Sequence, residues 1–182
     1  MDLFPDRGDK NIKIFEKSAT YFESTGTEVK IQALLPRAQL IAVLLEPGER
    51  AYSWYQHQRA HGVEDALAYS FYQVLQTKKS NTSLYRLKQR CLEPGLYAKN
   101  LRRWFDKFPD NQIIIVDGNQ LKVDPIPLMN NLQKKLNVKY YDYTKLIAYD
   151  EHKGYYCPLD ENGKTKCLGR GKVILLLFNK PF

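Results

Sequence analysis

The chain has 182 residues, of which 43% are hydrophobic, and its 28 lysine and arginine residues against 20 acidic ones give a net charge of +8. This length suits one domain, and the apolar content with thirteen tyrosines excludes a disordered polyelectrolyte. The longest apolar run, residues 173–178, is far shorter than the roughly 20 residues of a membrane span, so we expect no membrane contact from this chain. No signal-peptide pattern is visible, which predicts a cytosolic protein or one whose targeting segment is missing.

The first half of the chain alternates between helical and strand patterns. A short amphipathic helix is predicted over residues 28–35, and the apolar run 39–45 has the length of a strand buried on both faces. A helix follows over residues 49–61. Another is predicted over residues 65–76, with Leu67 and Val74 among the side chains that face the core.

The second half repeats this alternation. A helix over residues 96–108 is predicted to turn Trp104 and Phe105 inward, and residues 112–116 form a second buried strand. After a helix over residues 125–136, two short segments are spaced as a hairpin, at residues 145–149 and 154–158. The order of helices and strands predicts an α/β layer fold.

Basic residues are concentrated in two segments. Residues 78–107 hold nine basic side chains and two acidic ones, and residues 153–180 hold six against Asp160 and Glu161. Such surfaces attract polyanions, which include nucleic acids, sulfated polysaccharides and phosphorylated small molecules. A solvated basic face is the alternative, which composition alone slightly favours. No signature of a nucleic-acid-binding fold is present, so we expect no nucleic-acid partner.

Two cysteines lie ten residues apart on either side of a turn signal. Cys157 and Cys167 flank Asn162-Gly163, so the chain can fold back and bring the sulfurs together. A disulfide there would stabilise the fold by about 3 kcal/mol and would indicate an oxidising compartment. Zinc is the competing interpretation, although a CxxC pair is absent, and spacing alone leaves the pairing open. Cys91 would remain a free thiol.

Five functional side chains share one face of the helix predicted over residues 49–61. At about 100° per residue, they fall within one arc of roughly 100°. These are Arg50, Ser53, Trp54, His57 and His61. Arg50 and Ser53 lie near a helix start, where the dipole and amide groups favour a phosphate. Trp54 offers a stacking surface, and His57 can carry protons near neutral pH.

Two other interpretations of this helix stay open. His57 and His61 have the spacing of a zinc pair, but Gln58 replaces the glutamate of the metalloprotease pattern and no third ligand is evident, so we expect no metal. Alternatively, Trp54 belongs to the core and the histidines are ordinary surface residues.

Four segments of the sequence carry a family resemblance. The string RAYSWYQHQRAH at residues 50–61 closely resembles the sulfotransferase domain of the heparan sulfate N-deacetylase/N-sulfotransferases. So do FEKSATYF at 15–22, CLEPGLY at 91–97 and GKTKCLG at 163–169. The segments occur in the family's order and cover nearly the whole chain. The resemblance implies a P-loop-like sulfotransferase fold, in which helices flank a central parallel sheet.

The resemblance also implies a donor and its binding residues. In this family the co-substrate is 3′-phosphoadenosine 5′-phosphosulfate (PAPS), and Arg50 and Ser53 match positions that hold its 3′-phosphate. Tyr156 matches an aromatic position at the nucleotide. Lys172 begins a basic loop that closes over the nucleotide. Cys157 and Cys167 match the family's disulfide pair.

The implied reaction is transfer of a sulfuryl group to a glucosamine amine during heparan sulfate biosynthesis. The acceptor is a heparan sulfate or heparosan chain, and Trp54, His57 and His61 match positions near its glucosamine. Lys17 matches a lysine at the reacting centre, and Lys17 and His57 are the expected catalytic residues. The resemblance places the reaction in the Golgi lumen, where the full-length family member is anchored in the membrane.

The sequence departs from the family at two places. The first strand and the Lys-Thr-Gly-Thr-Thr loop for the 5′-phosphosulfate are absent, together with the catalytic glutamate that follows. After Lys172 the family continues Gly-Arg-Lys-Tyr-Pro, whereas this chain reads VILLLFNKPF. We therefore expect a partial sulfotransferase domain over residues 1–172 and a divergent apolar tail over 173–182. The alternative function is a catalytically inactive fragment that binds nucleotide or heparan sulfate.

Overall fold

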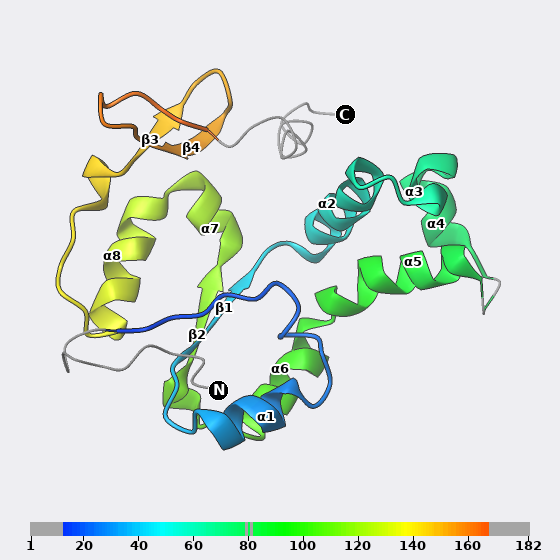
Figure 1. The fold of residues 1–182 in the computed structure, drawn as a ribbon, viewed down its shortest axis with the longest axis horizontal. Coiled ribbons are helices and arrows are strands. Elements are labelled where there is room, and N and C mark those ends of the chain that lie inside the picture. The colour runs from blue at the N-terminus through cyan, green and yellow to red at the C-terminus, as the bar shows by residue number, and fades with distance from the viewer. Residues whose placement is uncertain (1–12, 79, 81, 168–182) are drawn as a thin grey trace.

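The computed structural model describes residues 13–78, 80 and 82–167 (Figure 1). Helices are interspersed with strands along the chain, and two of the strands are parallel, which confirms the predicted α/β class. The helices are α1 (Thr27–Leu34), α2 (Pro47–Ala60), α3 (Glu64–Ala68), α4 (Phe71–Gln76), α5 (Ser83–Leu92), α6 (Tyr97–Phe105), α7 (Gly118–Val123) and α8 (Pro125–Lys135). The strands are β1 (Leu40–Leu44), β2 (Ile113–Asp117), β3 (Ile147–Asp150) and β4 (Tyr155–Pro158). Three short 3₁₀ helices are η1 (Glu93–Gly95), η2 (Asp110–Gln112) and η3 (Tyr143–Lys145).

Strands β1 and β2 form a parallel pair through the middle of the molecule. Their register runs from Leu40 opposite Ile113 to Leu44 opposite Asp117. In Figure 1, α7 and α8 lie on one side of this pair, and α2 to α5 lie on the other. Parallel strands need a long crossover, and the segment from α2 to α6 supplies it. None of the helices in the described part of the chain is long and apolar enough to cross a bilayer.

The prediction that β1 is buried on both faces was wrong. Ile41 is 45% exposed and Val43 is 51% exposed. Helix α8 places Leu128 in one buried cluster with Ile114 and Val116, which belong to β2. The described sheet containing β1 has two strands and α8 packs over the second, so the side chains of β1 keep contact with solvent.

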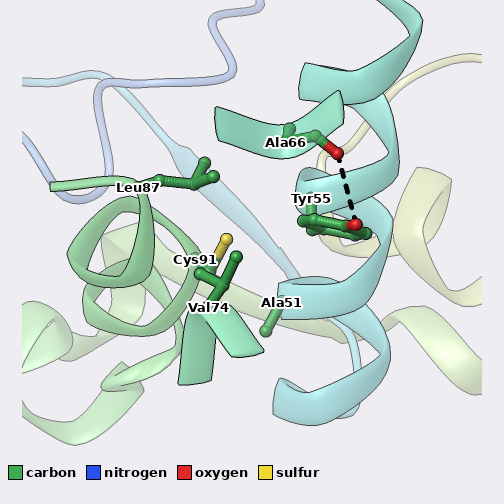
Figure 2. Packing of buried hydrophobic residues seen from close by; sticks show 6 residues of the cluster. All are labelled: Ala51, Tyr55, Ala66, Val74, Leu87 and Cys91. Atoms are coloured by element: carbon green, nitrogen blue, oxygen red, sulfur yellow. Dashed lines mark hydrogen bonds between the residues drawn. The ribbon is translucent and has the colours of Figure 1, made fainter. Parts of the chain in front are cut away.

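A second core joins four helices on the other side of the sheet (Figure 2). Its buried members are Ala51, Tyr55, Ala66, Val74, Leu87 and Cys91. The hydroxyl of Tyr55 donates to the carbonyl of Tyr69 at 2.6 Å and also lies 3.3 Å from the carbonyl of Ala66. Ala51 and Tyr55 lie four residues apart on α2, so this core fixes one face of α2.

The helix predicted over residues 65–76 is interrupted. Tyr69 has extended backbone angles, and α4 restarts after Ser70. The Ser70 hydroxyl accepts from the backbone N–H of Gln73, whose side chain accepts from the N–H of Ser70 in return. This capping box stabilises a new helix start. Leu67 is consequently 55% exposed, so the prediction that it faces the core was wrong, and Phe105 of α6 is exposed as well.

The predicted hairpin is present near the end of the described chain. Strands β3 and β4 pair antiparallel, and Cys157 of β4 forms a disulfide with Cys167. The structure therefore confirms the cysteine pairing. The Asp150 carboxylate accepts from the Thr165 hydroxyl at 2.5 Å, and this bond lowers the pKa of Asp150. Residues 158–167 are thus held against the hairpin by both a covalent bond and a hydrogen bond.

We expect Tyr55→Phe to destabilise the fold by about 1–3 kcal/mol, because it leaves the buried carbonyl of Ala66 and the part-buried carbonyl of Tyr69 without their hydroxyl donor. Urea denaturation measures the free energy of unfolding. Tyr72→Phe is the matched control, since Tyr72 is exposed, and should change stability by less than about 0.5 kcal/mol. Equal stabilities of the two variants would contradict the role given to the Tyr55 hydroxyl.

Replacing both Cys157 and Cys167 by alanine should lower the free energy of unfolding by about 3 kcal/mol, because the closed loop no longer restricts the unfolded chain. Denaturation with and without a reductant provides the control. The reductant should destabilise the original chain by a similar amount and leave the double variant unchanged. An original chain indifferent to reductant would argue against the cross-link.

Candidate functional site

Helix α2 begins shortly after β1, and an acidic side chain caps its N-terminus. The Glu46 carboxylate accepts from the backbone N–H of Glu49 at 2.6 Å. Hydrogen bonds from the N–H groups of Gly48 and Glu49 lower the pKa of Glu46. The amide groups at this helix end are therefore already engaged. An anion beside Arg50 and Ser53 would be held by side chains on the flank of α2, and not by the helix end that the sequence suggested.

One face of α2 carries a line of rings, which we name the ring row: Trp54, His57 and His61. The ring centroids of Trp54 and His57 are 5.3 Å apart, and those of His57 and His61 are 4.2 Å apart. Both histidines are exposed, whereas Trp54 is half-buried. These contacts confirm that the three residues share one face, as helical spacing predicted.

Arg50 links α2 to the end of α5. Its guanidinium donates to the carbonyl of Cys91 at 2.8 Å, and burial lowers the pKa of Arg50. The guanidinium stays protonated and has five N–H donors. Its other donors have no hydrogen-bond partner among the described residues. Arg50 therefore combines a structural contact with donors that are available to an anion next to the half-buried Ser53.

Cys91 is the free thiol that the sequence predicted, and it is fully buried. Burial raises the pKa of the Cys91 thiol to about 11, although Arg50 and Arg90 act in the opposite direction. The thiol is therefore neutral at physiological pH. It contributes packing between α2 and α5, and a neutral buried thiol is a poor nucleophile.

Sequence reasoning missed the position of Arg90. This residue of α5 counted only as one charge in the basic segment 78–107, but its guanidinium lies 5.5 Å from the centroid of the Trp54 ring. The indole N–H of Trp54 is buried and has no hydrogen-bond partner within the described part of the chain. Trp54 also packs against the helical core, so the core interpretation of this residue is partly correct. Spacing along one helix gives no signal for a contact between two helices.

The remaining predicted site residues lie apart from this face or outside the described residues. Lys17 is exposed in the segment before α1, and Tyr156 of β4 packs edge-on against Tyr149 with centroids 5.4 Å apart. Across residues 13–78, 80 and 82–167, no hydrogen bond, ion pair or ring contact joins Lys17 or Tyr156 to the α2 face. Lys172 and the predicted tail 173–182 lie outside the described residues.

One group of three possible metal ligands occurs in the described chain. Ligand atoms of Asp150, Cys157 and Cys167 lie within 4.8 Å of one another. Both sulfurs are committed to the disulfide, so they are not free to ligate. His57 and His61 have no third ligand among the described residues.

Comparison with known proteins identifies the family. A sulfotransferase domain matches residues 21–173. The chain is 45% identical over 175 residues to bifunctional heparan sulfate N-deacetylase/N-sulfotransferase 3 of Homo sapiens, and 47% identical to enzyme 2 of Mus musculus. Each match covers 94% of this chain and 20% of the relative. The Drosophila melanogaster enzyme is 42% identical over 186 residues, and the match covers 94% of this chain and 18% of that enzyme.

A solved structure shares the fold. The sulfotransferase from Alicyclobacillus acidocaldarius superposes with a TM-score of 0.55 at 24% identity, and covers 65% of this chain and 47% of that chain. The chain spans about a fifth of the length of the bifunctional relatives. The family resemblance seen in the sequence is thus confirmed, and the chain belongs to the sulfotransferase domain family.

Proposed function

We propose that this chain is part of a heparan sulfate N-sulfotransferase, which moves a sulfuryl group from PAPS to the amine of a glucosamine in a heparan-type chain. One observation carries the proposal. Arg50, Ser53 and the ring row occupy one face of α2, within a chain 42–47% identical to relatives named for this activity. An anion-binding pair and a row of aromatic and imidazole rings suit a phosphorylated donor beside a sugar acceptor.

Donor binding is assigned to four residues. Arg50 supplies N–H donors to the 3′-phosphate, and the Ser53 hydroxyl donates a further hydrogen bond, because charge-assisted bonds to phosphate are strong. Tyr156 offers its ring to the nucleotide. Lys172 adds positive charge over it.

Acceptor binding and catalysis are assigned to the ring row and Lys17. Trp54 and His61 position the glucosamine, and His57 takes a proton from its amine as the nitrogen attacks sulfur. The sulfur–oxygen bond to the donor's phosphate breaks, so adenosine 3′,5′-bisphosphate leaves. Lys17 stabilises the negative charge on the oxygens of the transferred group, as cations do in phosphoryl transfer. Lys17 is also the alternative carrier of the amine's proton.

The reaction takes place in the Golgi lumen. Residues 1–172 are a partial sulfotransferase domain, and residues 173–182 are a divergent tail. The disulfide supports the location, since such bonds persist in oxidising compartments. A second function has its own support. The alternative is a module that binds nucleotide or heparan sulfate without turnover, and the two basic segments, 78–107 and 153–180, support it because they attract polyanions.

We expect Ser53→Ala to weaken binding of adenosine 3′,5′-bisphosphate about tenfold, because a hydrogen bond to a charged phosphate is lost. Calorimetric titration of the 182-residue chain measures the affinity. Arg50→Ala should weaken binding at least as much, and Arg50→Lys tests whether charge alone suffices. Thermal unfolding of each variant is measured alongside, because Arg50 also bonds to the carbonyl of Cys91.

Ser83→Ala is the control variant, since Ser83 is exposed at the start of α5. It should leave the affinity for adenosine 3′,5′-bisphosphate unchanged. Unchanged affinity in folded Ser53→Ala and Arg50→Ala variants together would overturn the assignment of the 3′-phosphate to this face.

A further inference from the structure

The end of α5 extends the ring row across a helix boundary. The Arg90 guanidinium lies 5.5 Å from the Trp54 ring, whose other neighbours in the row are His57 and then His61. One line therefore runs from a cation through an indole to two imidazoles. Helices α2 and α5 share the buried core that holds Ala51 and Cys91 (Figure 2). The packing of this core keeps the two helices, and so the side chains of this line, in place.

No described residue forms an ion pair that would neutralise the charge on Arg90. Arg90 is exposed, and it forms no ion pair with any described residue. Glu93, the nearest acidic residue along the chain, instead accepts a hydrogen bond from Gln89 at 3.4 Å. Stacking on an aromatic face restricts the orientation of a guanidinium and leaves its N–H edges free for hydrogen bonds. The planar guanidinium of Arg90 therefore offers parallel N–H donors whose spacing matches two oxygens of a carboxylate or sulfo group.

We propose that Arg90 determines specificity for the acceptor by binding a carboxylate or sulfo group on a sugar next to the glucosamine at the ring row. The inference rests on the function proposed for the α2 face and adds a residue from α5 to it. Because Arg90 lies at the Trp54 end of the row, with His61 at the opposite end, it places the acidic sugar on one side. The site then discriminates acidic polysaccharides from neutral amino-sugar chains.

Binding measurements on the 182-residue chain test this role. The ligands are a heparosan oligosaccharide, which has carboxylates and no sulfo groups, and a chitin oligosaccharide of equal length, which has neither. Arg90→Gln should weaken heparosan binding about tenfold, because a charge-assisted bond is lost. Arg86→Gln removes the same charge one turn earlier on α5 and should change the affinity only about twofold. Neither variant should alter the affinity for the chitin oligosaccharide.

Two further measurements identify the chemical group that Arg90 binds. The first uses a partly N-sulfated heparosan of the same length. If Arg90→Gln weakens binding of this ligand more than binding of unsulfated heparosan, Arg90 binds a sulfo group. If the two losses of affinity are equal, Arg90 binds the carboxylate. Arg90→Lys keeps the charge without the planar fork, so we expect an affinity between those of the original chain and Arg90→Gln.

Several outcomes would overturn the inference. If Arg90→Gln and Arg86→Gln weaken heparosan binding equally, Arg90 acts only as one of several basic surface residues and has no specific role. A loss of affinity for adenosine 3′,5′-bisphosphate in Arg90→Gln would place this residue at the donor. A chain that binds the nucleotide but not heparosan would contradict the role of Arg90 while donor binding stands. A chain that binds heparosan through Arg90 but not the nucleotide would support the inference and refute donor binding.

Discussion

The packing of α2 against α5 is the contact on which the candidate site depends. Tyr55 and Cys91 are buried where the helices meet, and Arg50 closes the end of α5 through the Cys91 carbonyl. With this side of α2 fixed, the adjoining face carries Ser53 and the ring row, in which Trp54 packs against the core and the two histidines are exposed. A shift of α5 would separate Arg90 from Trp54 and remove the bond made by Arg50. The core thus determines which functional groups are neighbours.

The charges at this site follow a common pattern. Glu49 of α2 forms an ion pair with Lys122, and the Glu23 carboxylate acts on Arg50 from a longer distance, whereas neither Arg50 nor Arg90 forms an ion pair with any described residue. Unpaired cations repel one another and contribute little to stability, but they raise the local concentration of an anionic ligand. Glu46 occupies the amide groups at the start of α2. An anion on this face would therefore be held by side chains and not by the amide groups at the helix start.

Much of the fold could be predicted from the sequence because apolar periodicity reports local structure. The two parallel strands, the hairpin and most helices follow from runs and spacings of apolar residues. The break before α4 was also readable, since Ser70 and Gln73 have the spacing of a capping box. The exposure of β1 was not, because burial depends on which elements cover a strand. Ile41 and Val43 look like core residues in the sequence, yet α8 packs over β2 instead.

The shared face of α2 was predicted in the same way, whereas Arg90 required a tertiary contact that no spacing reveals. The central claim is that this face recognises a 3′-phosphate. Calorimetric titration of the chain with adenosine 3′,5′-bisphosphate, compared with 2′-deoxyadenosine 5′-monophosphate, tests it most directly. We predict clear binding of the first nucleotide and at least about tenfold weaker binding of the second, because the second lacks the charge held by Arg50 and Ser53. Equal affinities, or no binding by a well-folded sample, would contradict the account.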